Sequence, residues 1–250
     1  MSNGSPLKID VLYEDADIVA VNKPSGLMVH SDGRNEGPFL TDWIMERYPE
    51  ITGIGEPARS VDGEPLERSG IVHRLDRETS GVILVAKTQE GFETLKKQFK
   101  DHAICKRYLA FVWGEAKEEF GTITRPIGRS SGDFRRWSAQ RGTRGETREA
   151  ETYWTRLWTG RAGTDKFSLL EAEPKTGRTH QIRVHFAAIQ HPIVGDSLYA
   201  PKRPKALGFE RTALHSRSIE FENVEGKRVN VEAPFPEDFA RACSELHIKI

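Results

Sequence analysis

The sequence IVHRLDRETSGVILVA, residues 71–86, decides how the rest of the chain is interpreted. Its second half is an apolar run typical of a buried strand, and its first half carries a dense cluster of charge. Asp76 lies between Arg74 and Arg77, and a carboxylate between two guanidinium groups stays ionised. These residues alone fit two interpretations: a polar loop with surface ion pairs, or a site that uses an ionised carboxylate as nucleophile or ligand.

The composition indicates a globular protein with one large domain or two small ones, because the chain has 250 residues, of which 37% are hydrophobic and 30% charged. No apolar run approaches the roughly 20 residues of a membrane helix, and Met1–Lys8 lacks the apolar centre of a signal peptide. Cys105 and Cys243 form no disulfide framework, and no Cys/His spacing indicates zinc. We expect a cytoplasmic protein with no metal.

The charge is zero overall but unevenly distributed along the chain. Residues 1–70 carry 6 Lys/Arg and 13 Asp/Glu, whereas residues 71–148 carry 16 and 10. Positive charge is therefore concentrated in the segment that begins with the 71–86 sequence. A local basic stripe can hold phosphates on a neutral protein, because local charge contacts the nucleic-acid backbone.

Hydrophobic periodicity predicts many short strands joined by turns and a few helices. This pattern indicates an α+β fold with a largely antiparallel sheet. Helices are expected over 39–48, after a cap at Thr88, after a cap at Thr179 and near the C-terminus, and 52–70 is expected to be a long loop. Strands are expected over 9–14, 18–22, 81–86, 106–113, 167–172, 213–221 and 228–231.

Residues 125–148 hold seven arginines against Asp133 and Glu146, with Phe134 and Trp137 between them. Four glycines make the segment loop-rich, and we expect a β-ribbon. Arginines with interleaved aromatics can contact phosphates and stack on bases, so the segment is interpreted as a nucleic-acid-binding surface rather than a charged hairpin without a ligand.

The sequence HRLDRETSG at 73–81 resembles the signature of the RluA-type pseudouridine synthases. Other segments resemble the same family in the same order, from about Tyr13 to Phe235. They are NKPSG at 22–26, KRYLA at 106–110, TGRTHQIRVH at 176–185, HPIVGD at 191–196 and LH at 214–215. The resemblance implies an enzyme that isomerises selected uridines in RNA, with a mixed, mostly antiparallel sheet and a central active-site cleft flanked by helices and loops.

The resemblance also implies roles for individual residues. Asp76 is expected to be the catalytic aspartate, Arg183 the arginine that pairs with it, and Tyr108 the tyrosine that packs against the base. Arg74 is expected to help hold the place of the extruded nucleotide in the RNA. No metal and no organic cofactor is implied.

The expected RNA-binding residues lie in three segments of the chain. Since only Met1–Lys8 precedes the expected catalytic domain at 9–250, without an S4 domain, RNA binding must rest on the catalytic domain. Replacing Arg135, Arg136 and Arg141 with alanine should weaken RNA binding and flatten its salt dependence. The full set comprises Arg74, Arg77, Arg129, Arg135, Arg136, Arg141, Arg178 and His180.

Three alternatives remain open from the sequence. A glycoside hydrolase also cleaves a bond at an anomeric carbon, but that chemistry usually needs two carboxylates flanking the bond. A second alternative is an RNA-binding module without activity, against which Asp76, Tyr108 and Arg183 argue. The third concerns the target, since similar proteins act on ribosomal RNA and on transfer RNA. We expect ribosomal RNA, and a monomeric protein.

Overall fold

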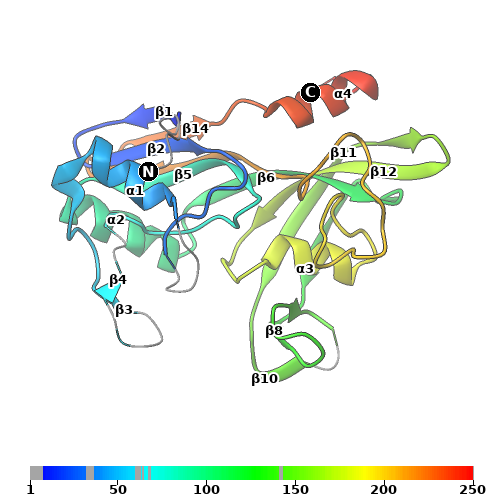
Figure 1. The fold of residues 1–250 in the computed structure, drawn as a ribbon, viewed down its shortest axis with the longest axis horizontal. Helices are drawn as coiled ribbons and strands as arrows, with labels where there is room; N and C mark the ends of the chain where they lie inside the picture. Colours follow the sequence, from blue (N-terminus) through cyan, green and yellow to red (C-terminus); the bar gives the residue numbers. More distant parts are fainter. Residues whose placement is uncertain are drawn as a thin grey trace. The chain divides into compact units, whose positions relative to one another are not determined.

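The computed structural model describes residues 8–31, 37–59, 63, 65–66, 69–140 and 143–249. The chain forms two compact units (Figure 1). One comprises Met1–Ile104 with Ser218–Ala233, and the other comprises Cys105–Arg217 with Pro234–Ile250. The predicted boundaries, a tail over 1–8 and one catalytic domain over 9–250, stay a prediction.

The first unit contains an antiparallel sheet built on the predicted apolar run. Strand β2 (Ile18–Lys23) pairs with β1 (Asp10–Glu14) on one side and with β5 (Ser80–Ala86) on the other. Every residue of β5 is buried, as its continuous apolar sequence predicts. Strand β13 (Leu214–Glu222) reaches this unit from Ser218 onward and pairs antiparallel with β14 (Arg228–Glu232).

Helix α2 (Gln89–Lys100) completes the core of this unit, and its cap is the predicted one. The Thr88 hydroxyl accepts from the backbone N–H of Gly91 at 3.1 Å, which satisfies one of the free donors at the helix start. Leu95 is fully buried against Val82 and Leu84 of β5 and Ile219 of β13. The lysines of this helix lie off its buried apolar stripe.

The segment between β2 and β5 carries short elements. Helix α1 (Leu40–Arg47) lies where the sequence predicts a helix, and a 3-10 turn, η1 (Pro49–Ile51), follows it. The expectation of an uninterrupted loop over 52–70 was wrong, because β3 (Ala58–Arg59) and β4 (Pro65–Leu66) pair antiparallel within it. Two-residue strands bury too little to leave a periodic signal in the sequence.

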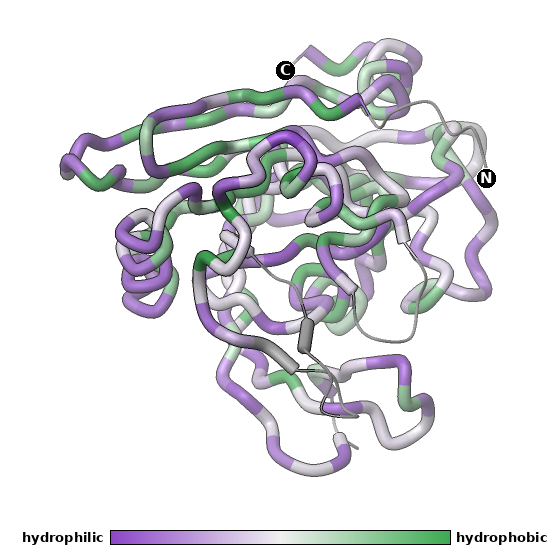
Figure 2. The backbone as a smooth tube through the Cα atoms, turned by 60° about the vertical axis from the view of Figure 1, so that its left-hand side comes forward, coloured by the Kyte–Doolittle hydropathy of each residue, from purple (hydrophilic) through white to green (hydrophobic). Residues whose placement is uncertain are grey.

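The second unit holds four antiparallel strands in the order β6, β12, β11 and β7. They are β6 (Cys105–Trp113), β12 (Asp165–Pro174), β11 (Glu151–Ala162) and β7 (Phe120–Thr124). Hydrophilic and hydrophobic residues follow one another at short intervals along the strands (Figure 2). The sequence predicted β6 and β12 but missed β11 and β7, whose sequences show no regular alternation of apolar and polar residues.

The predicted β-ribbon is a separate three-stranded sheet of the second unit. It consists of β8 (Ile127–Ser130), β9 (Trp137–Ser138) and β10 (Thr143–Arg148), with β8 in the middle. Ile127, Ala139 and Ala150 pack with Val184 and Ala188 of helix α3 (Gln181–Ala188), so the ribbon is held to that helix by a small apolar core.

Helix α3 starts differently from the prediction. Its N-cap is His180, in the left-handed conformation at φ 56°, and not Thr179. The Gln181 side-chain oxygen accepts from the Arg178 N–H at 3.0 Å and from the Thr176 hydroxyl at 2.6 Å. An amide at the start of the helix therefore organises the turn that a threonine hydroxyl was expected to organise. The C-terminal helix α4 (Glu237–Glu245) lies where a short helix was predicted.

Candidate active site

Asp76 lies in the turn that leads into β5 of the first unit. Its carbonyl accepts from the Thr79 N–H at 3.1 Å, which closes the turn, and its side chain is partly buried. Arg74 and Arg77 on either side of it are exposed. Both were expected to contact RNA, and their exposure leaves them accessible to a phosphate backbone.

A buried lysine, Lys23, holds this turn through hydrogen bonds to backbone carbonyls. The Lys23 ammonium group, at the end of β2, is fully buried and donates to the carbonyls of Pro24, Leu27 and Arg77 at 2.9, 2.8 and 3.2 Å. Burying a charge is costly unless hydrogen bonds compensate for lost water. Lys23 therefore joins the NKPSG turn at 22–26 to the strand-leading turn that carries Asp76.

Further hydrogen bonds join the same two turns. The Ser25 hydroxyl donates to the Glu78 carbonyl at 2.8 Å, and the Gly26 N–H donates to the Arg77 carbonyl at 2.8 Å. The Arg77 Nε returns a bond to the Gly26 carbonyl at 3.0 Å. Gly26 has φ +86°, a conformation that glycine adopts without strain. Two motifs that are some fifty residues apart in the sequence thus form one rigid support for Asp76.

His73 holds the other end of the motif. Its Nε2 accepts from the Leu84 N–H of β5 at 2.9 Å, so the proton of the neutral ring is on Nδ1. The ring packs against Phe99 of α2 with centroids 4.7 Å apart. The histidine of the HRLD sequence is therefore a structural residue that ties the start of the turn to the adjacent strand.

Tyr108 lies in β6 of the second unit and is 8% exposed. Lys106 points to the same face of the strand, two residues earlier. The pKa of Lys106 is lowered from 10.5 to about 8, mainly by burial, with a smaller opposing effect of Cys105 and a smaller lowering effect of Lys175. The KRYLA motif includes Lys106 but does not show its burial, which lets the amine lose its proton at a pH near 8.

Arg183 lies in α3 of the second unit and is 9% exposed. Its Nε and Nη2 donate to the two oxygens of Asp196 at 2.7 and 2.9 Å, and its guanidinium lies 5.1 Å from the centroid of the Tyr199 ring. The sequence predicted a carboxylate partner for this arginine and named Asp76. Asp196 is a partner that the sequence did not name, and the pairing with Asp76 stays a prediction.

Tyr199 links Arg183 to the arginine-rich sheet. Its hydroxyl accepts from the Trp137 N–H of β9 at 3.0 Å and bonds to His180 Nδ1 at 2.9 Å. His180, one of the expected RNA-binding residues, thus shares a partner with the catalytic candidate Arg183. Arg178, another of them, donates from Nε to the Glu149 carbonyl at 3.0 Å and is partly exposed.

The arginines of the three-stranded sheet are engaged in different contacts. Arg129 lies 4.3 Å from the centroid of the Trp137 ring and donates to the Phe134 carbonyl at 3.1 Å. Arg135 donates to both oxygens of Asp133, whose pKa this side-chain bond lowers to about 2. Arg136 lies 3.5 Å from the same carboxylate. Arg141 lies outside the described residues.

His185 of helix α3 has a structural role. It is fully buried, with Nε2 2.9 Å from the Arg125 carbonyl and Nδ1 2.9 Å from the Thr152 hydroxyl. A carbonyl only accepts, so Nε2 carries the proton and Nδ1 accepts from the threonine. Burial lowers the pKa of His185, which keeps the ring neutral.

Two further kinds of functional feature are absent from the described ranges. No group of three or more His, Cys, Asp or Glu residues could hold a metal ion there. None of the helices in the same ranges is both long and apolar enough to cross a membrane.

Comparison with known proteins shows the family. Residues 17–188 match the RNA pseudouridylate synthase family. An uncharacterized RNA pseudouridine synthase of Mycobacterium bovis is 39% identical, over 97% of this chain and 75% of its own length. The ribosomal large subunit pseudouridine synthase D of Xanthomonas campestris is 36% identical, over 96% of this chain and 70% of its own.

A solved structure agrees with these relatives. The human RNA pseudouridylate synthase domain containing 1 protein superposes with a TM-score of 0.71 at 28% identity, covering 94% of this chain and 87% of its own. The expected fold class, with a mostly antiparallel sheet and few helices, is confirmed, while the expected central cleft stays a prediction. The chain therefore belongs to the RluA-type family of RNA pseudouridine synthases, which are isomerases acting on RNA.

Proposed function

We propose that this enzyme converts selected uridines of ribosomal RNA to pseudouridine, with Asp76 as the catalytic residue. The observation that carries the proposal is the support of the Asp76 turn by the buried Lys23 and the 22–26 turn. A turn held by this many bonds suits a reacting group whose position must be preserved. The ribosomal target is supported by relatives named as ribosomal large subunit pseudouridine synthase D.

The reaction is an isomerisation and needs no co-reactant. The bond between N1 of uracil and C1′ of the ribose breaks, the base turns, and a bond forms between C5 and C1′. The proton on C5 is lost, and N1 gains one, so atoms and charge balance. A stacked base is inaccessible to these steps and must be flipped out of the RNA, at a cost of about a few kcal/mol.

In this proposal the ionised Asp76 either attacks C1′ or removes a proton from the sugar. Both routes need an ionised carboxylate that is oriented toward the sugar. The family resemblance assigns Arg183 as the arginine that pairs with this carboxylate. An arginine whose fork is fixed by a second carboxylate, as Asp196 fixes Arg183, is preorganised for that role.

Tyr108 is proposed to stack on the flipped base. A phenol with an ordinary pKa of about 10 is a poor base, so stacking suits it better than removal of the C5 proton. The largely buried position of its ring in β6 is consistent with an apolar contact.

RNA contacts are proposed for two groups of basic residues. Arg74 and Arg77 flank Asp76, and the others lie in and around the three-stranded sheet and at the start of α3, except Arg141, which is outside the described residues. Arg135 already pairs with Asp133 and must exchange this carboxylate for phosphate when RNA binds. The second group comprises Arg129, Arg135, Arg136, Arg141, Arg178 and His180.

The activity is tested with RNA labelled with tritium at C5 of uridine. Asp76→Asn should abolish tritium release while RNA affinity and the free energy of unfolding stay close to those of the natural enzyme. Glu78→Gln is the matched control, since the Glu78 backbone and not its carboxylate bonds to Ser25. Substantial release by Asp76→Asn would refute the assignment, and absence of release by the natural enzyme would favour a silent RNA-binding module.

The target is tested by mapping pseudouridines in RNA from cells with and without the protein. Loss of a modification from large-subunit ribosomal RNA is the expected result. Loss from transfer RNA alone would overturn the ribosomal assignment and leave the chemistry intact. The monomeric state and the cytoplasmic location stay predictions.

A further inference from the structure

A cavity of about 480 Å³ lies in the second unit, between the three-stranded sheet, helix α3 and the segment 199–203. This volume is within the usual range for sites that hold one small ligand. Its lining includes Arg136, Lys202 and Arg203 but no carboxylate. The cavity therefore favours an anionic ligand.

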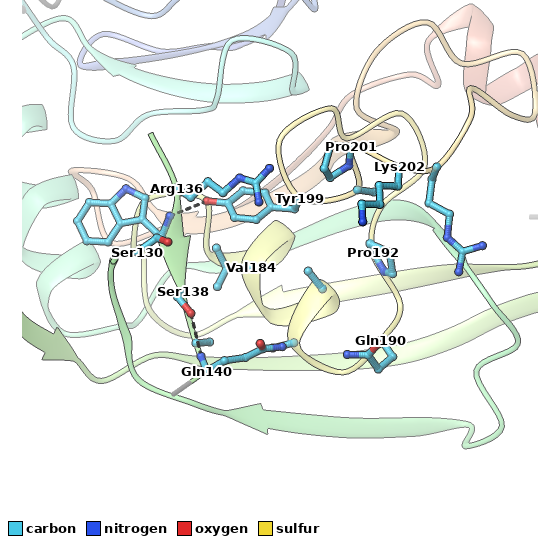
Figure 3. Close-up of a pocket in the computed structure, with 16 residues that line it drawn as sticks. Ser130, Arg136, Ser138, Gln140, Val184, Gln190, Pro192, Tyr199, Pro201 and Lys202 are labelled. Carbon is cyan, nitrogen blue, oxygen red and sulfur yellow. Dashed lines mark hydrogen bonds between the residues drawn. The ribbon is translucent and has the colours of Figure 1, made fainter. Parts of the chain in front are cut away.

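The polar groups of the cavity are divided between two sides. Figure 3 shows Arg136 and Lys202 on the side of Tyr199, and Gln140 and Gln190 on the opposite side. Val184 and Pro192 lie between the two sides, and they provide apolar surface. A ligand with an anionic end, a flat apolar body and a polar edge would match all three parts.

Arg136 carries a donor that suits such a ligand. Its Nε is buried and makes no hydrogen bond among the described residues, although it lies 3.5 Å from the Asp133 carboxylate, which is not part of the cavity lining. The carboxylate attracts the guanidinium at that distance without accepting its N–H, so a ligand atom that accepts from Nε would satisfy this donor. Lys202 is exposed and adds a mobile ammonium group on the same side.

The cavity also adjoins the proposed catalytic arginine. Tyr199 lines the cavity, and its ring faces the Arg183 guanidinium at 5.1 Å. A ligand in the cavity is thus separated from Arg183 by one side chain. An RNA nucleotide near the uridine being modified would meet this geometry.

We propose that this cavity binds one nucleotide of the RNA substrate, beside the modified uridine. Arg136, Lys202 and Arg203 hold its phosphate, Val184 and Pro192 contact the face of its base, and Gln140 and Gln190 bond to the base edge. The inference rests on the proposed function, because it places a neighbour of the reacting uridine. It assigns roles to four residues that no family motif includes, namely Lys202, Arg203, Gln140 and Gln190.

The phosphate contacts are tested by titrating a fluorescein-labelled oligouridylate at several salt concentrations. Lys202→Ala with Arg203→Ala should weaken binding roughly tenfold and lower the salt slope by about 1.4, since each phosphate contact on a single strand contributes about 0.7. The exposed pair Lys117→Ala with Lys227→Ala, with the same loss of charge outside the cavity, should leave affinity unchanged. The charge-preserving Lys202→Arg with Arg203→Lys should restore binding and shows that folding is not the cause.

The base contacts are tested with an abasic oligonucleotide of the same length. Gln140→Ala should weaken oligouridylate binding roughly fivefold, the effect expected for one lost hydrogen bond, and leave abasic binding unchanged. Equal weakening of both, or none, would overturn the base contacts, and an unchanged salt slope in the Lys202 and Arg203 variant would overturn the site. Both tests measure RNA binding and not tritium release, so a failure of this inference can be distinguished from a failure of the proposed function.

Discussion

The guanidinium group of Arg183 donates to both carboxylate oxygens of Asp196, at 2.7 and 2.9 Å. The Asp196 side chain is fully buried and also accepts from the backbone N–H groups of Leu198 and Tyr199, both at 3.0 Å. One carboxylate therefore sets the plane of the arginine fork and the course of the segment that carries Tyr199. The orientation of the Arg183 side chain therefore depends on Asp196, a residue outside helix α3.

Asp196→Asn should lower the free energy of unfolding by roughly 3–5 kcal/mol, the usual cost of removing one partner of a buried ion pair. The asparagine amide would also place a donor against the arginine donors. Urea unfolding measures the loss, and tritium release should fall even at concentrations where the variant is folded. Asp238→Asn is the control, because Asp238 makes a similar paired contact to Arg211 in the same unit. A folded Asp196→Asn variant with full activity would contradict the role assigned to the pair.

Tyr199 supports the same arginine with its ring and the arginine-rich sheet with its hydroxyl. Tyr199→Phe keeps the ring under Arg183 but leaves the Trp137 N–H without its acceptor, so we expect a loss of about 1 kcal/mol in stability and weaker RNA binding. Tyr199→Leu removes both and should reduce the rate of tritium release at saturating RNA as well. Tyr153→Phe, an exposed tyrosine of β11, is the control. Identical kinetics of the Phe and Leu variants would show that the ring has no part in positioning Arg183.

The elements that the sequence predicted are those whose signal is local. The apolar run of β5 and the Thr88 cap of α2 depend on neighbouring residues only, and both lie where they were predicted. The predicted start of α3 was wrong because the Gln181 side chain, and not the Thr179 hydroxyl, accepts a backbone hydrogen bond in the turn before the helix. A side-chain amide at that position is not a usual capping signal.

The candidate site depends on a different kind of signal. The family resemblance assigns roles to Asp76, Tyr108 and Arg183, and these roles stay predictions. It could not show which buried carboxylate faces Arg183, since Asp196 lies thirteen positions further along the chain. The role of Lys23 was equally hidden. Its ammonium group bonds to the carbonyl of a residue 54 positions later, and a lysine beside a proline turn gives no sign of being buried.

Lys23→Met tests the support of the Asp76 turn. Methionine fills similar space but cannot donate, so the carbonyls of Pro24, Leu27 and Arg77 lose a shared donor and stability should fall by roughly 2–4 kcal/mol. Tritium release should fall further than stability, because the turn that carries Asp76 loses its fixed position. Limited proteolysis should then cleave near residues 71–80. Lys8→Met, at an exposed position, is the control, and equal resistance to protease in both variants would contradict the support.

Lys106 should make the free energy of unfolding depend on pH in the alkaline range. Its pKa is about 8 in the folded state against an ordinary value of 10.5, first because of burial. Between these values the unfolded chain binds more protons than the folded one, so this group's contribution to stability increases as pH rises from about 8 to 10.5. Below pH 8 the buried charge opposes folding fully.

Lys106→Met should therefore change stability relative to the natural protein in a pH-dependent way. The stability of the natural protein minus that of the variant should rise by on the order of 1–3 kcal/mol between pH 8 and 10.5, measured by urea unfolding at each pH. Lys117→Met, at an exposed site of the same unit, should show no such trend. A constant difference between the natural protein and Lys106→Met across this range would mean that Lys106 keeps an ordinary pKa, and that its place beside Tyr108 in β6 leaves it hydrated.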